Sequence, residues 1–285
     1  MKQNMHDRCS TVMTVAGSDS GGGAGIQADL KTFAAFGVHG VSAIAALTAQ
    51  TTRGVSAVHL PPVEFLRAQM EDLFADFDVR AVKVGMLADA ERICCVAAVL
   101  RQFPRVPVVL DPVMVASSGA RLLAEDAVQA LRDQLVPLAT VITPNLPEAE
   151  VLLGRSLDSA ALLAAAAHDL RAAGAAWALM KGGHLNEGGR VVDRLYGPDT
   201  DFAFEHTRLD LSPHGTGCTL SAAIAALLAD GASIVNACAG AVSYVQHALR
   251  GGYRPGRGPL SVLAHVTATD MTDVPSAFQA KPIDS

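Results

Sequence analysis

The chain has 285 residues; half of them are hydrophobic, 18% are charged, and the formal net charge is −6. This balance indicates a globular enzyme with a sizeable core rather than a disordered or fibrous chain. The acidic net charge argues against a broad nucleic-acid-binding face, because the densest basic stretch, residues 250–257, is short. We therefore expect no nucleic acid among the partners.

The cysteines and the N-terminal residues bear on the compartment. Five cysteines, an odd number without CxxC spacing, predict neither a disulfide framework nor a structural zinc site. Residues 1–13 lack the apolar segment of a signal peptide, and the other apolar stretches are too short or too interrupted to span a membrane. We expect a cytoplasmic protein with no membrane partner.

Short, apolar, β-branched runs alternate with longer helical patterns along most of the chain. Buried strands are predicted at residues 12–16, 41–47, 79–84, 106–110, 140–143 and 176–180. Helices are predicted at 24–36, 62–76, 90–102, 125–135 and 158–174, the last beginning at Asp158 and ending at Gly174. This alternation predicts an α/β fold with a doubly wound, mostly parallel sheet flanked by helices.

The last third of the chain departs from this rhythm. Residues 191–196 and 202–205 predict a small antiparallel element around a Gly-Pro-Asp turn, which we expect to lead back to the site. Helices follow at 220–229 and 234–249. No repeat or linker divides the chain, so we predict a single domain over 1–285 with a core at about 12–265. The tail, 261–285, carries no recognisable chemistry.

The segment from His214 to Ser221 is the most informative stretch of the sequence. Gly215, Thr216 and Gly217 can turn tightly and direct successive amide N–H groups at one anion, and a helix that follows adds the positive end of its dipole. At this helix start, the pKa of Cys218 is expected to be lowered enough for the thiol to accept a proton near neutral pH. The alternative is a small buried side chain in a packing turn.

A second glycine-rich segment follows the first predicted strand, at residues 17–29. It would let the backbone approach a ligand closely. A dinucleotide fingerprint is not supported, since the glycines do not give GxGxxG, and the Walker A pattern is absent. A plain turn that closes a βα unit remains the alternative.

Charged residues follow three other predicted strands. Asp111 and Glu148 bring two carboxylates to one sheet edge, where hard oxygen ligands suit a Mg²⁺ that carries nucleotide phosphates, often through water. Lys181 would place an ammonium near phosphate. The alternatives are an ordinary acidic residue in a helix first turn and a solvated lysine.

Together these motifs resemble the ribokinase superfamily, and within it the hydroxymethylpyrimidine/phosphomethylpyrimidine kinases of thiamine biosynthesis. The resemblance runs from Val15 to about Leu249, and its motifs are AGSDSGGGAGIQAD at 16–29, ALTAQ at 46–50, KVGML at 83–87, DPVM at 111–114, TPNLPE at 143–148, KGGH at 181–184 and HGTGCT at 214–219. Their joint occurrence, in order, is highly specific.

The resemblance implies a ribokinase-like fold and ATP-dependent phosphorylation of 4-amino-5-hydroxymethyl-2-methylpyrimidine, then of its monophosphate. Gln50 matches the glutamine that binds the pyrimidine, and an amide can bind a ring nitrogen and the adjacent amine together. By the same matching, the substrate would be bound by Gly17, Ala24, Asp29, Met86 and Val113, the nucleotide by Lys181 and Asn145, and Mg²⁺ by Asp111 and Glu148. The alternative for Met86 and Val113 is a plain core position. Relatives of this kind are dimeric, so we expect a homodimer.

The residue at position 218 separates branches of this superfamily. Sugar kinases usually have aspartate there, so the cysteine points to the pyrimidine branch. Some pyridoxal-phosphorylating relatives look similar, which leaves pyridoxal kinase of vitamin B6 salvage as the alternative. We expect Cys218 to take the proton of the hydroxymethyl group and the amides of residues 215–218 to hold the transferring oxygens.

Two other classes of protein fit these residues less well than a kinase does. A non-catalytic binding protein would have little reason to hold Asp111, Glu148, Lys181 and Cys218 together. A hydrolase with a cysteine nucleophile would need a histidine partner, and the spacing places none.

Overall fold

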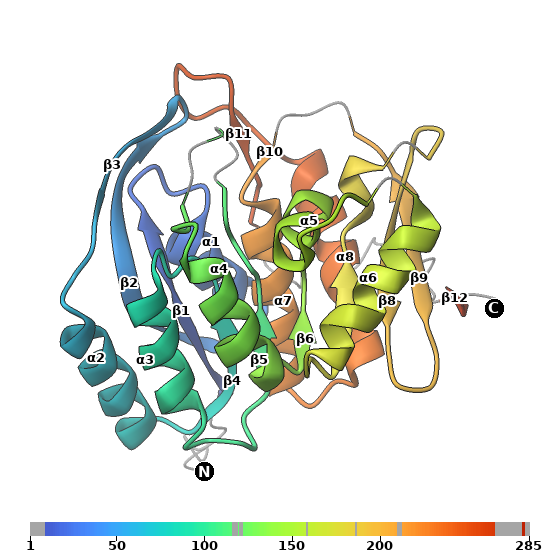
Figure 1. Cartoon of the computed structure of the whole chain (residues 1–285). Coiled ribbons are helices and arrows are strands. Elements are labelled where there is room, and N and C mark those ends of the chain that lie inside the picture. Colours follow the sequence, from blue (N-terminus) through green and yellow to red (C-terminus); the bar gives the residue numbers. More distant parts are fainter. Residues whose placement is uncertain are drawn as a thin grey trace, which may run out of the picture.

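The computed structural model describes residues 9–115, 119, 122–157, 159–185, 187–209, 213–265 and 281–282. Within these ranges, a ten-stranded sheet runs through the molecule in the order β12-β9-β8-β7-β6-β5-β4-β1-β2-β3 (Figure 1). Six neighbouring strands of the sheet, β2, β1, β4, β5, β6 and β7, pair in parallel. The antiparallel strands are β3 at one edge and β8, β9 and β12 at the other. The predicted doubly wound, mostly parallel sheet with an antiparallel part is confirmed.

The parallel strands are those that the sequence predicts. Their bounds are β1 Thr11–Asp19, β2 His39–Thr51, β4 Val79–Val84, β5 Val108–Leu110, β6 Val141–Ile142 and β7 Trp177–Met180. The antiparallel strands are β3 Gly54–His59, β8 Arg190–Tyr196, β9 Phe202–Thr207 and β12 Lys281–Pro282, and a separate two-stranded sheet joins β10 Pro213–His214 to β11 Ser261–Val262.

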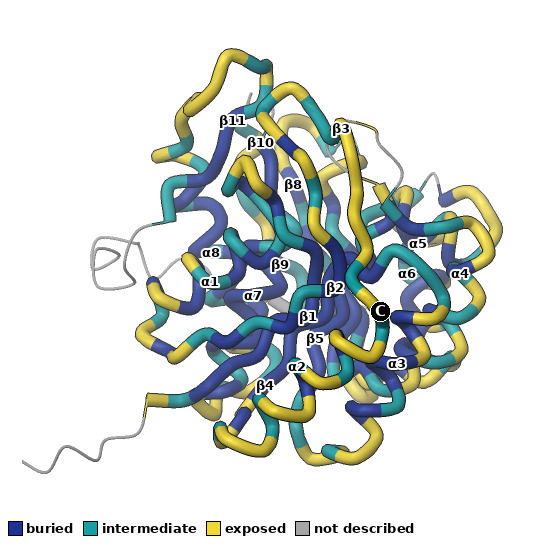
Figure 2. Tube along the Cα trace, turned by 90° about the vertical axis from the view of Figure 1, so that its left-hand side faces the viewer, coloured by how far each residue is buried: buried dark blue, intermediate teal, exposed yellow. Residues whose placement is uncertain are grey.

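The edge strand β3 was not predicted from the sequence. β3 has no buried residue and is mostly exposed, and Figure 2 shows it as a yellow outer strand. A strand without a buried face lacks the apolar alternation by which strands are predicted.

The helices between the strands also follow the predicted pattern, with differences at their ends. Their bounds are α1 Gly25–Ala35, α2 Val63–Asp76, α3 Ala90–Leu100, α4 Ala127–Ala130, α5 Leu146–Leu153, α6 Ala160–Ala172, α7 Thr216–Ala229 and α8 Ile234–Arg250. The helix predicted at 125–135 is α4 followed by a π-helical turn, Leu131–Leu135, and a 3₁₀ turn, Val136–Leu138. A further 3₁₀ turn spans Gly182–His184.

Several helix starts differ from the prediction, and α7 begins four residues earlier than predicted, at Thr216. Asp158 lies outside the described residues, and the residue that caps α6 is Ser159, whose side chain accepts a hydrogen bond from the Leu162 amide. The predicted cap was therefore wrong by one position. The short helix α5 was not predicted as an element; a capping box between Asn145 and Glu148 starts it.

Side chains on the two faces of the sheet pack into two separate hydrophobic cores. Met13, Val15 and Val84 pack with α2, α3, α4 and α6, whereas Val12 and Val109 pack with α1, α7 and α8. Figure 1 shows the first group of helices in front of the sheet and α7 and α8 behind it. Because both faces are covered, the parallel strands are nearly continuous apolar runs, which is why the sequence predicts them well.

The chain leaves the parallel strands at one edge of the sheet. In an open α/β sheet, ligands bind at the carboxyl ends of the strands. The glycine-rich turn after β1, Gln50 near the end of β2, Asp111 after β5 and Lys181 after β7 all lie there. No helix in the described ranges combines the length and the hydropathy needed to cross a membrane.

Candidate active site

Two cavities open beside each other at this edge. The smaller, of about 240 Å³, lies between the turn after β1, the end of β2 and the start of α7; the larger, of about 700 Å³, extends from the start of α7 toward α8 and β9. They share the wall formed by Val115, Asn145, Glu148, Lys181, Gly183, His184, Thr216 and Gly217. A molecule in one cavity could therefore meet a molecule in the other across this wall.

The glycine turn that begins α7 lies between the two cavities. Gly215 has a φ of 84°, and a Cβ there would lie 1.9 Å from the carbonyl oxygen of Gly23, so no other residue fits. No side chain caps α7, so the amides of its first turn remain available to an anion. The tight glycine turn at the helix start is the geometry that the sequence predicts, and its binding of an anion stays a prediction.

Gly217 keeps space open beside charged groups. A Cβ at Gly217 would lie 3.1 Å from the Lys181 Nζ and 3.5 Å from the Asp111 Oδ2. The absence of a side chain leaves a cradle between the start of α7, an ammonium and a carboxylate. A phosphate group is the kind of ligand that such a cradle holds.

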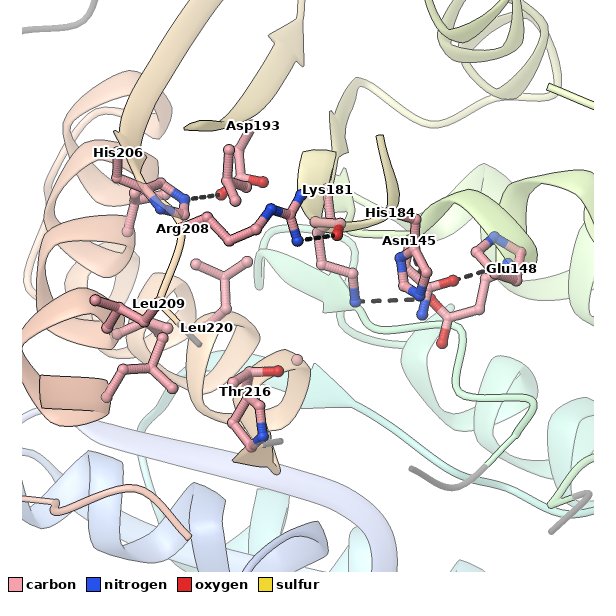
Figure 3. A pocket seen from close by; sticks show the side chains of 18 of the residues that line it. Asn145, Glu148, Lys181, His184, Asp193, His206, Arg208, Leu209, Thr216 and Leu220 are labelled. Atoms are coloured by element: carbon pink, nitrogen blue, oxygen red, sulfur yellow. Dashed lines mark hydrogen bonds and ion pairs between the residues drawn. The ribbon is translucent and has the colours of Figure 1, made fainter. Parts of the chain in front are cut away.

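Lys181 forms ion pairs with both carboxylates, Asp111 and Glu148, that the sequence predicts to bind Mg²⁺. Its Nζ lies 3.2 Å from Asp111 Oδ1 and 3.6 Å from Glu148 Oε2. Burial alone would lower the pKa of Lys181, but Asp111 and Glu148 raise it, so the lysine is charged. Burial raises the pKa of Glu148, while Lys181 opposes this increase. Figure 3 shows Lys181, Asn145 and Glu148 together on one wall of the larger cavity.

Cys218 lies at the predicted place but not in the predicted state. Burial raises the pKa of its thiol to about 11, although Lys83 nearby lowers it, and Asp29 and Asp111 add to the increase. The prediction that the helix start lowers this pKa was therefore wrong. Desolvation and two carboxylates outweigh the helix dipole and Lys83, so the thiol is protonated at neutral pH.

A buried ion pair lies behind Cys218. Lys83 Nζ is 2.9 Å from Asp29 Oδ2, both side chains are 0% exposed, and Thr14 donates a hydrogen bond of 2.6 Å to the same oxygen. Burial alone would lower the pKa of Lys83, but Asp29, Cys218 and Asp111 raise it. Asp29 does not line either cavity, so its predicted contact with substrate is corrected: its charged partner is Lys83, which borders the smaller cavity.

The structure brings the other predicted residues together around the cavities. The smaller cavity is lined by Gly17, Ala24, Gln50, Met86, Asp111, Val113, Asn145, Glu148, Lys181, Gly215, Thr216, Gly217 and Cys218. Gly17 and Met86 are in contact, since a Cβ at Gly17 would lie 2.6 Å from the Met86 sulfur.

Several lining residues carried no role in the sequence analysis. Asp19, Thr48, Lys83 and His214 line the smaller cavity. Each belongs to a motif that the sequence analysis quoted, but a motif does not show which of its side chains face a cavity.

The larger cavity adds polar residues from the antiparallel part of the sheet and from α8. His206 lies 3.4 Å from Asp193, and Arg208 donates hydrogen bonds to the carbonyls of Gly183 and Leu185 (Figure 3). The antiparallel element therefore leads back to the site, as predicted. Val242, Val245, Leu220 and Leu249 form an apolar part of the same lining.

The fold and the paired cavities define a ribokinase-like small-molecule kinase. A family model described as phosphomethylpyrimidine kinase matches residues 19–263, which is most of the chain. The chain belongs to this family.

Three known proteins illustrate the similarity. The chain is 49% identical over 254 residues to the hydroxymethylpyrimidine/phosphomethylpyrimidine kinase of Rhizobium meliloti, covering 87% of this chain and 95% of that protein. It is similar to the solved phosphomethylpyrimidine kinase of Clostridium difficile, with 40% identity, a TM-score of 0.75, and 84% and 99% of the two chains covered. It is also similar to the Bacillus subtilis pyridoxal kinase solved as an ADP complex, with 36% identity, a TM-score of 0.84, and 90% and 97% covered.

Proposed function

We propose that this protein uses ATP to phosphorylate 4-amino-5-hydroxymethyl-2-methylpyrimidine and then phosphorylates the monophosphate to the diphosphate. The observation that carries the proposal is the anion-binding turn at Gly215–Gly217 in the wall between the two cavities. Membership of the family and the 49% identity to a kinase of that name support it.

The larger cavity suits the nucleotide. Its apolar part, at Val242, Val245, Leu220 and Leu249, can enclose a base, and its opposite end carries Lys181 and the first turn of α7 for the phosphates. Asn145 lies at the same end, where its side chain caps α5. The similarity to a kinase solved as an ADP complex supports a nucleotide as one of the two ligands.

The residues present fit a Mg²⁺ that arrives with the nucleotide. Asp111 and Glu148 offer hard oxygen ligands beside the open space at Gly217. The described ranges contain no cluster of three or more His, Cys, Asp or Glu side chains that would form a full protein cage. When bound, the ion would neutralise phosphate charge, and Asp111 and Glu148 would hold it, directly or through water.

The smaller cavity suits the acceptor. Gln50 would read the ring, Gly17, Ala24, Met86 and Val113 would line it, and the hydroxymethyl group would face the turn at Gly215. The alcohol oxygen attacks the γ-phosphorus, the bond to the ADP oxygen breaks, and ADP leaves. The hydroxyl proton is lost late, to an oxygen of the transferred phosphoryl group and from there to water. In the second step the attacking atom is a phosphate oxygen, which already carries negative charge.

Positioning and electrostatic stabilisation are the principal sources of rate in this proposal. The transition state of phosphoryl transfer is loose, so the acceptor needs little activation, and charge on the transferred group is stabilised by the α7 amides and Lys181. Cys218, protonated at neutral pH, borders this group and is not proposed as the base. Lys83 adds a buried positive charge on the acceptor side.

We further propose a homodimer in the cytoplasm. Large apolar side chains are exposed on adjoining segments at one edge of the molecule, including Leu47, Val58, Leu60 and Phe65, which is 59% exposed. Such a surface is typical of protein–protein contact. Light scattering during size-exclusion chromatography would give the mass, and a monomer would contradict the proposal.

The function is tested by counting the phosphates transferred. We expect the protein with Mg-ATP to convert hydroxymethylpyrimidine through its monophosphate to the diphosphate, as seen by mass spectrometry. Reactions without ATP and reactions with Gln50→Leu serve as controls. No product from either pyrimidine would contradict the proposal. Product from pyridoxal alone would support the second candidate, a pyridoxal kinase, which the similarity to the Bacillus subtilis enzyme favours.

A further inference from the structure

A chain of polar contacts runs along the wall of the smaller cavity and ends on Gln50. His214 Nε2 lies 3.1 Å from Asp19 Oδ2 and 2.9 Å from the Gln50 amide nitrogen. The Gln50 amide oxygen lies 3.1 Å from Thr48 Oγ1, whose hydroxyl also lies 2.9 Å from the Ser18 carbonyl oxygen. The positions of the protons in these contacts decide whether the oxygen or the nitrogen of the Gln50 side-chain amide faces His214, and which of the two faces Thr48.

Asp19 is the fixed end of the chain because it is an ionised carboxylate. Its Oδ1 accepts a hydrogen bond from the Gly21 amide, and its Oδ2 accepts from the amides of Gly23 and Ala24. Burial alone would raise the pKa of Asp19, but these hydrogen bonds and the one from His214 lower it below the ordinary value.

A carboxylate so close to an imidazole nitrogen determines where the imidazole proton is. Asp19 Oδ2 can only accept, so the contact with His214 is attractive when Nε2 carries a proton and repulsive when Nε2 presents a lone pair. Once protonated, Nε2 has no lone pair, and it cannot accept a hydrogen bond from the Gln50 amide.

The Thr48 hydroxyl, at the other end of the Gln50 side-chain amide, favours the same orientation of that amide. Thr48 has one hydroxyl proton, and the Ser18 carbonyl, which can only accept, takes it. The Thr48 oxygen can then accept a hydrogen bond from Gln50 but cannot donate one. His214 and Thr48 therefore both favour the opposite orientation of the Gln50 side-chain amide. A rotation of 180° about its Cγ–Cδ bond places the oxygen toward His214 and the nitrogen toward Thr48.

The backbone of Gln50 is also held, which leaves this rotation as the main freedom of the side chain. The backbone N–H of Gln50 donates to Ser20 Oγ at 2.8 Å, and Ser20 Oγ donates to the backbone carbonyl of Gln50 at 2.8 Å. The side chain itself is 8% exposed and faces the cavity. Its orientation is thus set before a ligand arrives.

We propose that Asp19 and His214 act as positioning residues that lock the Gln50 amide with its oxygen toward His214, and so select a ring with an amine donor beside a nitrogen acceptor. In this orientation the single Nε2 proton of His214 is shared between Asp19 Oδ2 and the Gln50 oxygen as a three-centre hydrogen bond, and the Gln50 nitrogen donates to Thr48. The amide then keeps one acceptor on oxygen and one donor on nitrogen for the substrate. This inference rests on the proposed function, in which Gln50 reads the pyrimidine.

The 4-oxo analogue of the substrate is the matched probe. It has the same ring and hydroxymethyl group but presents an acceptor beside an N–H donor, which is the reverse order. A locked amide rejects it, because a buried polar site discriminates strongly against a mismatched partner. A freely rotating amide would accept both rings.

The experiment compares kcat/KM for the amino and oxo pyrimidines in three proteins. We expect the unmodified protein to prefer the amino ring by about 10³-fold, and His214→Leu to reduce the preference below about tenfold by improving turnover of the oxo ring. His214→Gln, which keeps an N–H near the Nε2 position, should retain a preference above about 100-fold. A purely structural role for His214 would lower both activities together and leave the ratio unchanged, which would overturn the proposal.

A second measurement does not depend on turnover or on a variant. ¹⁵N NMR of the ligand-free protein, labelled at histidine, reports which ring nitrogens of His214 are protonated. We expect a proton on Nε2, and an Nε2 without a proton would overturn the proposal. If neither pyrimidine is phosphorylated while Nε2 is protonated, the failure lies with the proposed function and not with the lock.

Discussion

Cys218 shows how a buried site can override a local rule. A thiolate at a helix start gains from the dipole, but that gain is modest beside the desolvation of a partly buried charge in the wall of the cavity. Asp29 and Asp111 oppose the thiolate further, and Lys83 offsets only part of this. The thiol stays neutral in the protein without ligands, and the anionic phosphates of ATP would favour the neutral form further.

The kinetics of Cys218→Ser test this conclusion. We expect kcat to fall less than about tenfold for both phosphorylations, because loss of a general base would cost about 10²–10⁴-fold. We also expect flat pH profiles for the unmodified protein between pH 7 and 9. If the thiolate were the base, the first step would accelerate about tenfold per pH unit toward the pKa of about 11, and Cys218→Ser would abolish that rise.

At the scale of elements, the start of α7 and the turn after β1 are built against each other. Gly215 fits only because it has no Cβ and adopts a positive φ beside the Gly23 carbonyl. Val262, on β11, packs on the other side of Gly23, where a Cβ would lie 2.8 Å from Val262 Cγ1. The anion-binding turn is therefore shaped by three segments that are distant in the sequence.

A pair of alanine substitutions separates backbone strain from this contact. Gly215→Ala and Gly231→Ala impose similar strain, with φ values of 84° and 86°, but a Cβ meets an atom within 4 Å only at Gly215. We expect both to lose about 1–2 kcal/mol of stability from strain. Gly215→Ala should lose more than Gly231→Ala, because its Cβ would also clash with the Gly23 carbonyl, and only Gly215→Ala should lower kcat, by more than 100-fold. Urea unfolding and steady-state kinetics measure the two effects. Equal activities would show that the turn does not hold the transferred group.

The Asp29–Lys83 pair connects α1 to β4. Lys83→Met leaves a buried carboxylate without its charged partner, and we expect a loss of about 3–5 kcal/mol in the free energy of unfolding. The double substitution Asp29→Asn with Lys83→Met removes both charges and should recover at least half of that loss. Urea midpoints measure both. A single variant that loses less than about 1 kcal/mol would show that the pair is not coupled to folding.

At the scale of the whole molecule, the segment after α8 returns to the site. β11 pairs with β10, directly before the Gly215 turn, and the Gly258 amide donates to Thr52 Oγ1 in the β2–β3 turn, two residues after Gln50. His265 then lies 3.1 Å from Thr219 on α7. The start of the tail that the sequence left without a role, residues 261–265, thus supports the glycine turn, and Gly258, just before the tail, supports the turn that follows Gln50.

The histidine in this segment predicts a pH dependence of stability. Burial lowers the pKa of His265 to about 4, with a further contribution from Lys31. Between about pH 6.5 and 4, the unfolded chain binds a proton at this residue that the folded protein does not, so stability falls as the pH drops through this range. His265→Asn should remove part of this fall, about 1–3 kcal/mol between pH 7 and 4, as measured by thermal or urea unfolding. Parallel stability curves for both proteins would contradict this.

The sequence by itself determined the parallel sheet, the flanking helices and most of the residues around the cavities. Buried parallel strands are continuous apolar runs, and the loops after them carry the glycines and charges of the site, so both signals are local. The strand β3 and the helix α5 were missed because one has no buried face and the other is short.

Only the tertiary structure decided the state and the partners of the site residues. The protonation of Cys218, the pairing of Asp29 with Lys83 and the chain from Asp19 through His214 to Gln50 depend on burial and on contacts between distant segments; His214 and Gln50 are 164 positions apart. Electrostatic energies depend on distance and desolvation, and neither is encoded in the spacing of residues along a chain.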